Sequence, residues 1–141
     1  MVSREQILEC LDILELKYTE FENNTVAISF SDEKYFSYPV ITFITIRENS
    51  LIFHSEAQDY HPAGDLYALA NRHNCRSYAP ACYIDEDGNV VMERVFSLVN
   101  EVTPHYILED VVRPSVFLPL QAFANFELSD EEIARRRASE E

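Results

Sequence analysis

Glycine is scarce in this chain, with only Gly64 and Gly88 among 141 residues. Phosphate-cradling loops and dinucleotide fingerprints need several glycines close together, so that backbone amides can approach the ligand. No such loop can be written here. The sequence therefore excludes P-loop and Rossmann nucleotide-binding functions.

Long apolar runs are absent as well. The longest, residues 40–46, contains two threonines and is far too short to span a bilayer. The first six residues lack the apolar core of a signal peptide. The three cysteines, Cys10, Cys75 and Cys82, form neither a CxxC nor a zinc-ribbon spacing, and an odd count fits a reducing compartment. We expect a cytoplasmic protein with reduced, structural cysteines.

Basic residues are few, 11 against 25 acidic ones, which gives a formal net charge of −14. Nucleic-acid affinity depends on Lys and Arg replacing condensed counterions, so a surface this acidic repels polyanions. The one basic cluster, Arg135 to Arg137, lies among acidic residues near the C-terminus. We expect no nucleic-acid or membrane partner, and a basic or hydrophobic protein partner remains possible.

The sequence contains clear local signals for helices and strands. Ser3 and Gln6 have capping-box spacing ahead of an apolar stripe, which predicts a helix over residues 3–16. Pro62 suits the first turn of a second helix that reaches residue 74, and Thr103-Pro104 begins a third. We expect Pro114 and Pro119 to kink or restart that third helix.

Alternation and β-branched composition predict the strands, and residues 32–37 are a polar loop. Asn23-Asn24 and Asp87-Gly88 are typical hairpin turns. The predicted strands cover residues 18–22, 25–30, 40–47, 51–56, 81–85 and 90–98.

Short connections make the sheet antiparallel, which predicts an α+β fold with five or six strands and three helices. The order is α-β-β-β-(β)-α-β-β-α, one strand fewer if the first segment merges with its neighbour. Residues 1–128 form one domain. Residues 129–141 form a charged tail, either disordered or a short helix begun by Ser129 and Glu132.

Catalytic signatures are missing, and one stretch gathers potential metal ligands. His54 and Glu56 lie two apart on one strand face, and Asp59 and His61 follow in the next loop. A metal would need two histidines and a carboxylate to converge, and nothing in the spacing forces this. We expect an exposed strand end that leads into a polar turn, with no metal, cofactor or catalytic residue.

The third helix is more apolar than one small sheet requires, so we expect it to contact another chain. The predicted partner or dimer surface consists of Val112, Val116, Phe117, Leu120 and Phe123. Aromatic residues could add binding pockets, although most aromatics in a domain of this size belong to the core. The candidates are Tyr35, Phe36, Tyr38, Phe53, Tyr60, Tyr67 and Tyr83.

Residues 71–74 (NRHN), residues 81–91 (ACYIDEDGNVV) and the long apolar C-terminal helix carry a family resemblance. Over residues 3–126 the chain resembles the YbjN family, bacterial proteins described as regulators of sensory transduction. That family is similar in fold to the class I chaperones of type III secretion, which commonly pair as acidic homodimers. The two prolines of the last helix and the tail after Ser129 depart from the family pattern. The family has no established catalytic residues to carry over.

The resemblance implies a non-enzymatic, chaperone-like or regulatory module that binds a protein or peptide and acts as a homodimer. In such chaperones, apolar pockets and strand-edge hydrogen bonds hold an extended partner segment. One alternative is a metal-dependent hydrolase centred on His54, Glu56 and His61. Another is a purely structural subunit that joins an oligomer through the third helix.

Overall fold

One antiparallel sheet of six strands carries the fold in the computed structural model, which describes residues 2–31, 38–76 and 80–140. The strands are β1 (Thr19–Phe21), β2 (Thr25–Phe30), β3 (Val40–Ile46), β4 (Ser50–Ala57), β5 (Ala81–Ile84) and β6 (Val90–Ser97). The helices are α1 (Arg4–Ile13), α2 (Leu66–Arg76), α3 (Pro104–Tyr106), η1 (Ile107–Val112), α4 (Arg113–Asn125) and α5 (Asp130–Glu140). The predicted α+β class is confirmed, with the larger of the two strand counts. The polar loop predicted at residues 32–37 lies outside the described residues.

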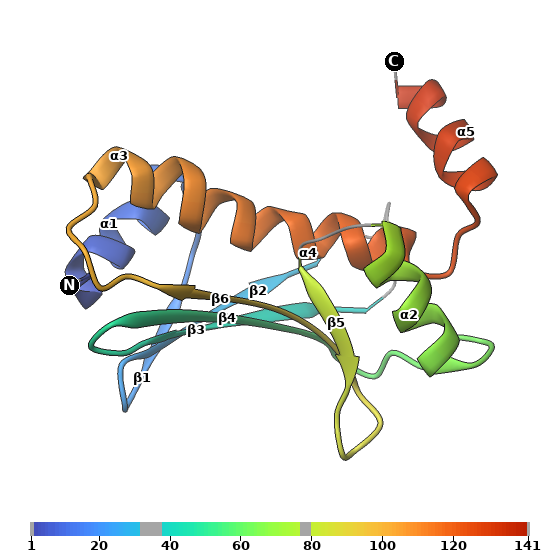
Figure 1. Ribbon diagram of the computed structural model, residues 1–141, viewed down its shortest axis with the longest axis horizontal. Helices are drawn as coiled ribbons and strands as arrows, with labels where there is room; N and C mark the ends of the chain where they lie inside the picture. Colours follow the sequence, from blue (N-terminus) through green and yellow to red (C-terminus); the bar gives the residue numbers. More distant parts are fainter. Residues whose placement is uncertain (1, 32–37, 77–79, 141) are drawn as a thin grey trace.

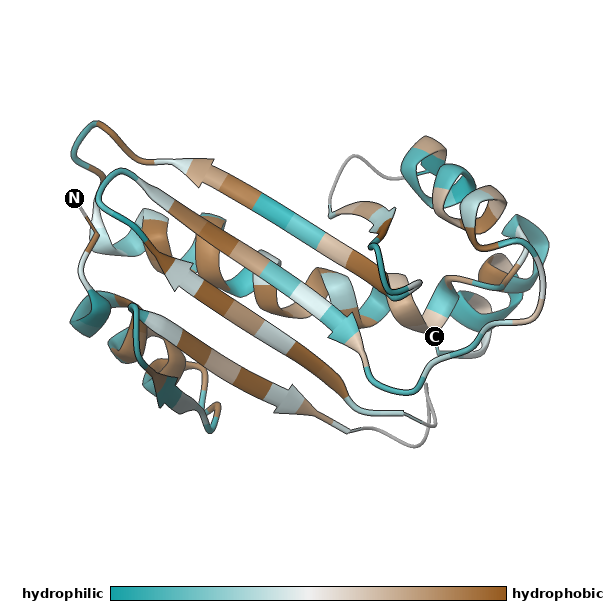
Figure 2. Cartoon of the chain, turned by 90° about the horizontal axis from the view of Figure 1, so that it is seen from below, coloured by the Kyte–Doolittle hydropathy of each residue, from teal (hydrophilic) through white to brown (hydrophobic). Residues whose placement is uncertain are grey.

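The strands are ordered β1-β2-β3-β4-β6-β5, and each neighbouring pair is antiparallel. The last strand therefore lies between β4 and β5, and α2 makes the crossover that allows this. Helices α1 and α3 to α4 cover one face of the sheet, while α2 packs beside β5 (Figure 1). No helix of the described residues covers the opposite face (Figure 2).

Two helix boundaries differ from the prediction for local reasons. Helix α1 has the predicted capping box, with Ser3 and Gln6 bonded to each other, but it ends at Ile13 because Glu15 takes a left-handed backbone (φ 59°). Helix α2 does not begin after Pro62. Its N-cap is Asp65, whose Oδ1 accepts hydrogen bonds from two first-turn amides, so the aspartate fixes the start of the helix.

The third helix is continuous from residue 104 to residue 125, so the expected restart at proline was wrong. Thr103 caps it as predicted, accepting a bond from the Tyr106 amide at 3.1 Å. Before Pro114 the helix widens into the π-helical segment η1, where the Arg113 amide bonds to the Leu108 carbonyl five residues back. Proline lacks a donor and crowds the preceding turn, and a wider turn accommodates it.

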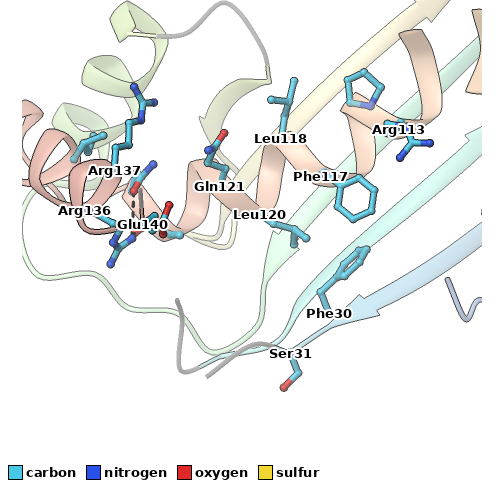
Figure 3. Close-up of a pocket in the computed structure, with 14 residues that line it drawn as sticks. Phe30, Ser31, Arg113, Phe117, Leu118, Leu120, Gln121, Arg136, Arg137 and Glu140 are labelled. Atoms are coloured by element: carbon cyan, nitrogen blue, oxygen red, sulfur yellow. Dashed lines mark hydrogen bonds between the residues drawn. The ribbon is translucent and has the colours of Figure 1, made fainter. Parts of the chain in front are cut away.

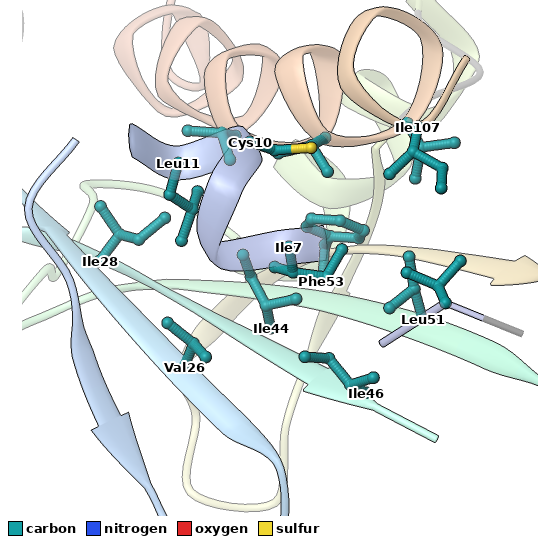
Figure 4. Close-up of a cluster of buried hydrophobic side chains, with 14 of the residues drawn as sticks. Ile7, Cys10, Leu11, Val26, Ile28, Ile44, Ile46, Leu51, Phe53 and Ile107 are labelled. Carbon is teal, nitrogen blue, oxygen red and sulfur yellow. The ribbon is translucent and has the colours of Figure 1, made fainter. Parts of the chain in front are cut away.

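The hydrophobic core lies between the sheet and the covering helices. At one end, α1, η1 and the ends of β2, β3 and β4 bury a cluster that includes Ile7, Leu11 and Phe53 (Figure 4). At the other end, a second cluster around Phe123 and Phe126 packs against β5, β6 and α2. The polar pairs Thr42–Ser55 (2.7 Å) and Arg94–Ser115 (3.2 Å) satisfy buried hydroxyl groups within the same layer.

The charged segment predicted as a tail or short helix forms α5, which extends from the end of α4 away from the sheet (Figure 1). Ser129 and Glu132 cap it, which agrees with the helical one of the two alternatives. Arg136 Nη1 donates to the Ala124 carbonyl at 2.9 Å, and Arg76 pairs with Asp130 at 2.7 Å. Among the described residues, no helix is both long and apolar enough to cross a membrane.

Candidate partner-binding site

The four candidate metal ligands lie on β4 and in the loop that follows it. His54 and Glu56 lie on the open face, where His54 Nε2 is 2.6 Å from Glu56 Oε1. Its Nδ1 is 3.1 Å from Oε2 of Glu93, on the neighbouring strand β6, and the Tyr83 hydroxyl donates to the same oxygen at 2.9 Å. Both ring nitrogens of His54 are therefore within hydrogen-bond distance of a carboxylate of this chain.

Asp59 and His61 lie in the loop after β4. Between them, Tyr60 packs edge-on against Phe123 at the helix-covered side, and its hydroxyl donates to Glu127 at 2.9 Å. Burial of the hydroxyl is the main cause that raises the pKa of Tyr60, and the hydrogen bond to Glu127 is the second. Within residues 2–31, 38–76 and 80–140, no three His, Cys, Asp or Glu side chains gather in a way that could hold an ion. The centre required by the hydrolase alternative is therefore not assembled there.

The cysteines are free thiols. Burial raises the pKa of the Cys82 thiol to about 12 and also raises that of Cys10. Since the nucleophile is the thiolate, both buried thiols are unreactive at neutral pH.

The five residues of the predicted partner surface separate into two groups. Val112, Val116 and Phe123 are buried within the core of the chain itself, whereas Phe117 is 40% exposed and Leu120 is partly exposed. At 3.6 residues per turn, Phe117 lies about 140° around the helix from Val112, while Val116 and Phe123 lie within about 40° of it. The helical wheel was therefore a usable signal, and only Phe117 and Leu120 can reach a partner.

The aromatic pocket candidates have diverse roles. Phe53 is core, Tyr38 and Tyr60 stack on each other at 4.2 Å, and Tyr67 and Tyr83 are exposed. Tyr35 and Phe36 lie outside the described residues.

Phe117 and Leu120 lie in a groove of about 740 Å³ between α4, α5 and the end of β2. Figure 3 shows Phe30 facing Phe117 at one end of the groove, with their ring centroids 6.4 Å apart, and the arginines of α5 at the other end. The lining comprises Phe30, Ser31, Arg113, Pro114, Phe117, Leu118, Leu120, Gln121, Ala124, Asn125, Ile133, Arg136, Arg137 and Glu140. A groove of this size and composition can hold apolar side chains together with a few charged ones.

Sequence reasoning did not find the α5 wall of this groove. Ile133, Arg136 and Arg137 were placed in a charged tail, because a segment with one large apolar residue has no periodicity to read. The Ser129–Glu132 capping pattern was the available signal for the helix. The turn that places α5 beside α4 is held by long-range bonds, among them Arg76 to the Leu128 carbonyl at 2.8 Å. Such contacts are invisible in a single sequence.

The structure is a helix-covered antiparallel sheet with an apolar, arginine-bearing groove. Residues 3–109 match the YbjN family model, whose description is putative bacterial sensory transduction regulator. The match spans well over half of the chain, so this protein belongs to the YbjN family. That membership indicates a regulatory or protein-binding role. No curated protein matches the chain.

The family match ends at residue 109, before the groove begins on α4. Of the lining residues, only Phe30 and Ser31 lie inside the matched region. The family therefore accounts for the sheet and for α1 and α2, while α4 and α5 supply most of the groove.

Proposed function

We propose that this protein is a non-enzymatic regulatory module that binds a protein partner in the groove between α4 and α5. The observation that carries the proposal is Phe117, a large aromatic side chain 40% exposed beside Leu120 in an apolar groove. Aromatic anchors in such pockets supply much of the binding energy in protein complexes. Of the chaperone-like mode expected from the family resemblance, this proposal keeps the apolar pocket for a partner segment and locates it in the groove.

We also propose that the protein is a homodimer, formed through the open face of the sheet. That face carries Ile41, Phe43 and Ile52 on the central strands and Val95, which is 59% exposed, on β6. The sheet is uncovered on that side (Figure 2), and two such faces can pack about 10 Å apart with their apolar side chains interdigitated.

The remaining expectations belong to the same proposal. A cytoplasmic location agrees with reduced cysteines, and the net charge of −14 opposes binding to nucleic acid and to anionic membranes. A purely structural role in an oligomer would make the groove itself the site of self-association.

The test compares three single variants with the wild type: Phe117→Asp in the groove, Val95→Asp on the open face, and the control Tyr67→Asp on α2. Tyr67 is 72% exposed and lines neither surface. Light scattering should show a dimer for the wild type, Phe117→Asp and Tyr67→Asp, and a monomer for Val95→Asp. If Phe117→Asp alone dissociates the dimer, the groove joins copies of this chain and the structural alternative is right.

Capture of partners from the native cell should recover a protein with the wild type and with Tyr67→Asp. The same protein should be lost with Phe117→Asp. A partner that binds the wild type, Tyr67→Asp and Phe117→Asp equally would show that the groove is not the binding site.

A further inference from the structure

Among the residues that the structure describes, the lining of the groove has more basic than acidic side chains. It includes three arginines, Arg113, Arg136 and Arg137, against one carboxylate, Glu140, in a chain whose net charge is −14. More than a quarter of all Lys and Arg side chains of the chain therefore lie around one apolar groove. Charge arranged in this way selects among partners more strongly than it adds affinity.

The three guanidinium groups are held differently. Arg113 pairs with Glu109 one turn earlier through two bonds of 2.9 and 3.1 Å, so much of its charge is neutralised. Arg136 is held in place by bonds to the Ala124 carbonyl and the Asn125 side-chain oxygen. Arg137 is exposed and makes no ion pair within the described part of the chain. At the α5 end of the groove, the side chain of Arg137 is thus the more exposed of the two.

The sheet edges disfavour a partner that adds a strand. On β5, the Asn74 side chain accepts from the Cys82 amide at 2.8 Å and donates to the Cys82 carbonyl at 3.0 Å, which occupies the outward backbone groups of that residue. At the other edge, β1 has three residues, and Arg4 donates to the Phe21 carbonyl. Edges blocked in this way resist pairing with another chain.

We infer that the groove takes an acidic amphipathic helix of another protein. Its apolar side chains would pack on Phe30, Phe117 and Leu120, and its carboxylates would meet Arg136 and Arg137. A helix fits because both long walls of the groove are helices, and helix-in-groove recognition uses apolar anchors at i, i+3, i+4 and i+7. This inference rests on the proposed partner-binding role of the groove and specifies the class of partner.

A random 16-residue peptide library displayed on phage, selected on the full-length protein and counter-selected on Phe117→Asp, tests the class of partner. We expect the selected peptides to combine Leu or Phe at helical spacing with Asp or Glu. Winners rich in Lys or Arg that still require Phe117 would overturn the acidic class and leave the proposed function standing. The absence of any peptide that depends on Phe117 would overturn both.

Charge reversal on the selected peptide tests the contact itself. Arg137→Glu should weaken binding about tenfold, and a Glu→Lys change in the peptide should restore it. Arg135→Glu is the matched control, because Arg135 is the same residue type on α5 outside the groove lining, and it should change binding less than about twofold. Equal losses from the two reversals would show that only the overall charge matters, which would overturn the inference.

A small anionic amphiphile is the competing occupant, since the groove volume also suits such molecules. Dodecanoate should displace the peptide only weakly. Tight binding of dodecanoate to the wild type, lost in Arg137→Glu, together with no selected peptide, would show that the groove is a lipid-like ligand site.

Discussion

The two phenylalanines of α4 that were grouped in one predicted surface should behave differently when truncated. Phe123 is buried at 2% exposure, with the Tyr60 ring packed edge-on against it, so Phe123→Ala leaves a cavity in the second core cluster. Such a change costs about 3–5 kcal/mol. Phe117 is 40% exposed, and three-fifths of the burial of a phenylalanine corresponds to about 1–2 kcal/mol for Phe117→Ala.

Urea unfolding followed by far-ultraviolet circular dichroism measures both losses, and equal slopes would show that the unfolded states are comparable. A domain of this size is stabilised by about 5–15 kcal/mol, so Phe123→Ala should still fold but unfold at much lower urea. Binding should respond in the reverse order, with Phe117→Ala impaired and folded Phe123→Ala nearly normal. Equal free-energy losses for the two variants would refute the division of α4 into a core side and a groove side.

Three further outcomes are expected. Asn74→Ala should lower the free energy of unfolding in urea by about 1–2 kcal/mol and increase self-association in light scattering, because it leaves the backbone of Cys82 at the β5 edge without its side-chain partner. Unchanged self-association would mean that Asn74 does not prevent strand pairing at this edge. Tyr38→Phe should reduce the loss of stability at alkaline pH, because burial raises the pKa of Tyr38 to about 12. The stability that the protonated hydroxyl contributes is complete below the unfolded-state pKa of 10 and is lost as the pH rises to 12. Urea midpoints measured across this pH range would contradict the prediction if they fell equally in the wild type and the variant. Deletion of residues 129–141 should leave the rest of the α+β fold intact, with cooperative melting followed by circular dichroism, since α5 is joined to it by few polar bonds. A product without cooperative melting would show that the remaining fold requires α5.

The parts of this fold that the sequence predicts correctly depend on interactions a few residues apart. The Ser3–Gln6 capping box, the Thr103 cap and the turn at Gly88 (φ 82°) all close within five residues, and each stands where expected. Competing local signals explain one error. Both Pro62 and Asp65 are residue types that begin helices. The helix begins after Asp65 because its carboxylate accepts hydrogen bonds from two backbone amides of the first turn.

The parts that could not be predicted depend on strand order. A hairpin of β5 and β6 was evident, but its placement with β6 against β4 requires the α2 crossover. That placement alone puts Glu93 opposite His54. His54, one of the four candidate metal ligands, lies in a hydrogen-bonded cluster drawn from three strands, and spacing along the chain could not predict this because it says little about neighbours across a sheet.

Net charge and the groove lining favour different partners, because net charge averages over surfaces that act separately. A chain at −14 favours a basic partner at long range, yet exposed charges further apart than about 8 Å are largely screened at physiological salt. In the described lining of the groove, a docked helix would meet Arg136 and Arg137 together with one carboxylate, Glu140. The two effects have opposite signs, so added salt should speed association by screening the general repulsion and also speed dissociation by weakening the arginine contacts. If the association and dissociation rate constants of the selected acidic peptide both increase with salt, the electrostatic repulsion by the whole protein acts separately from the attraction by the arginines of the groove.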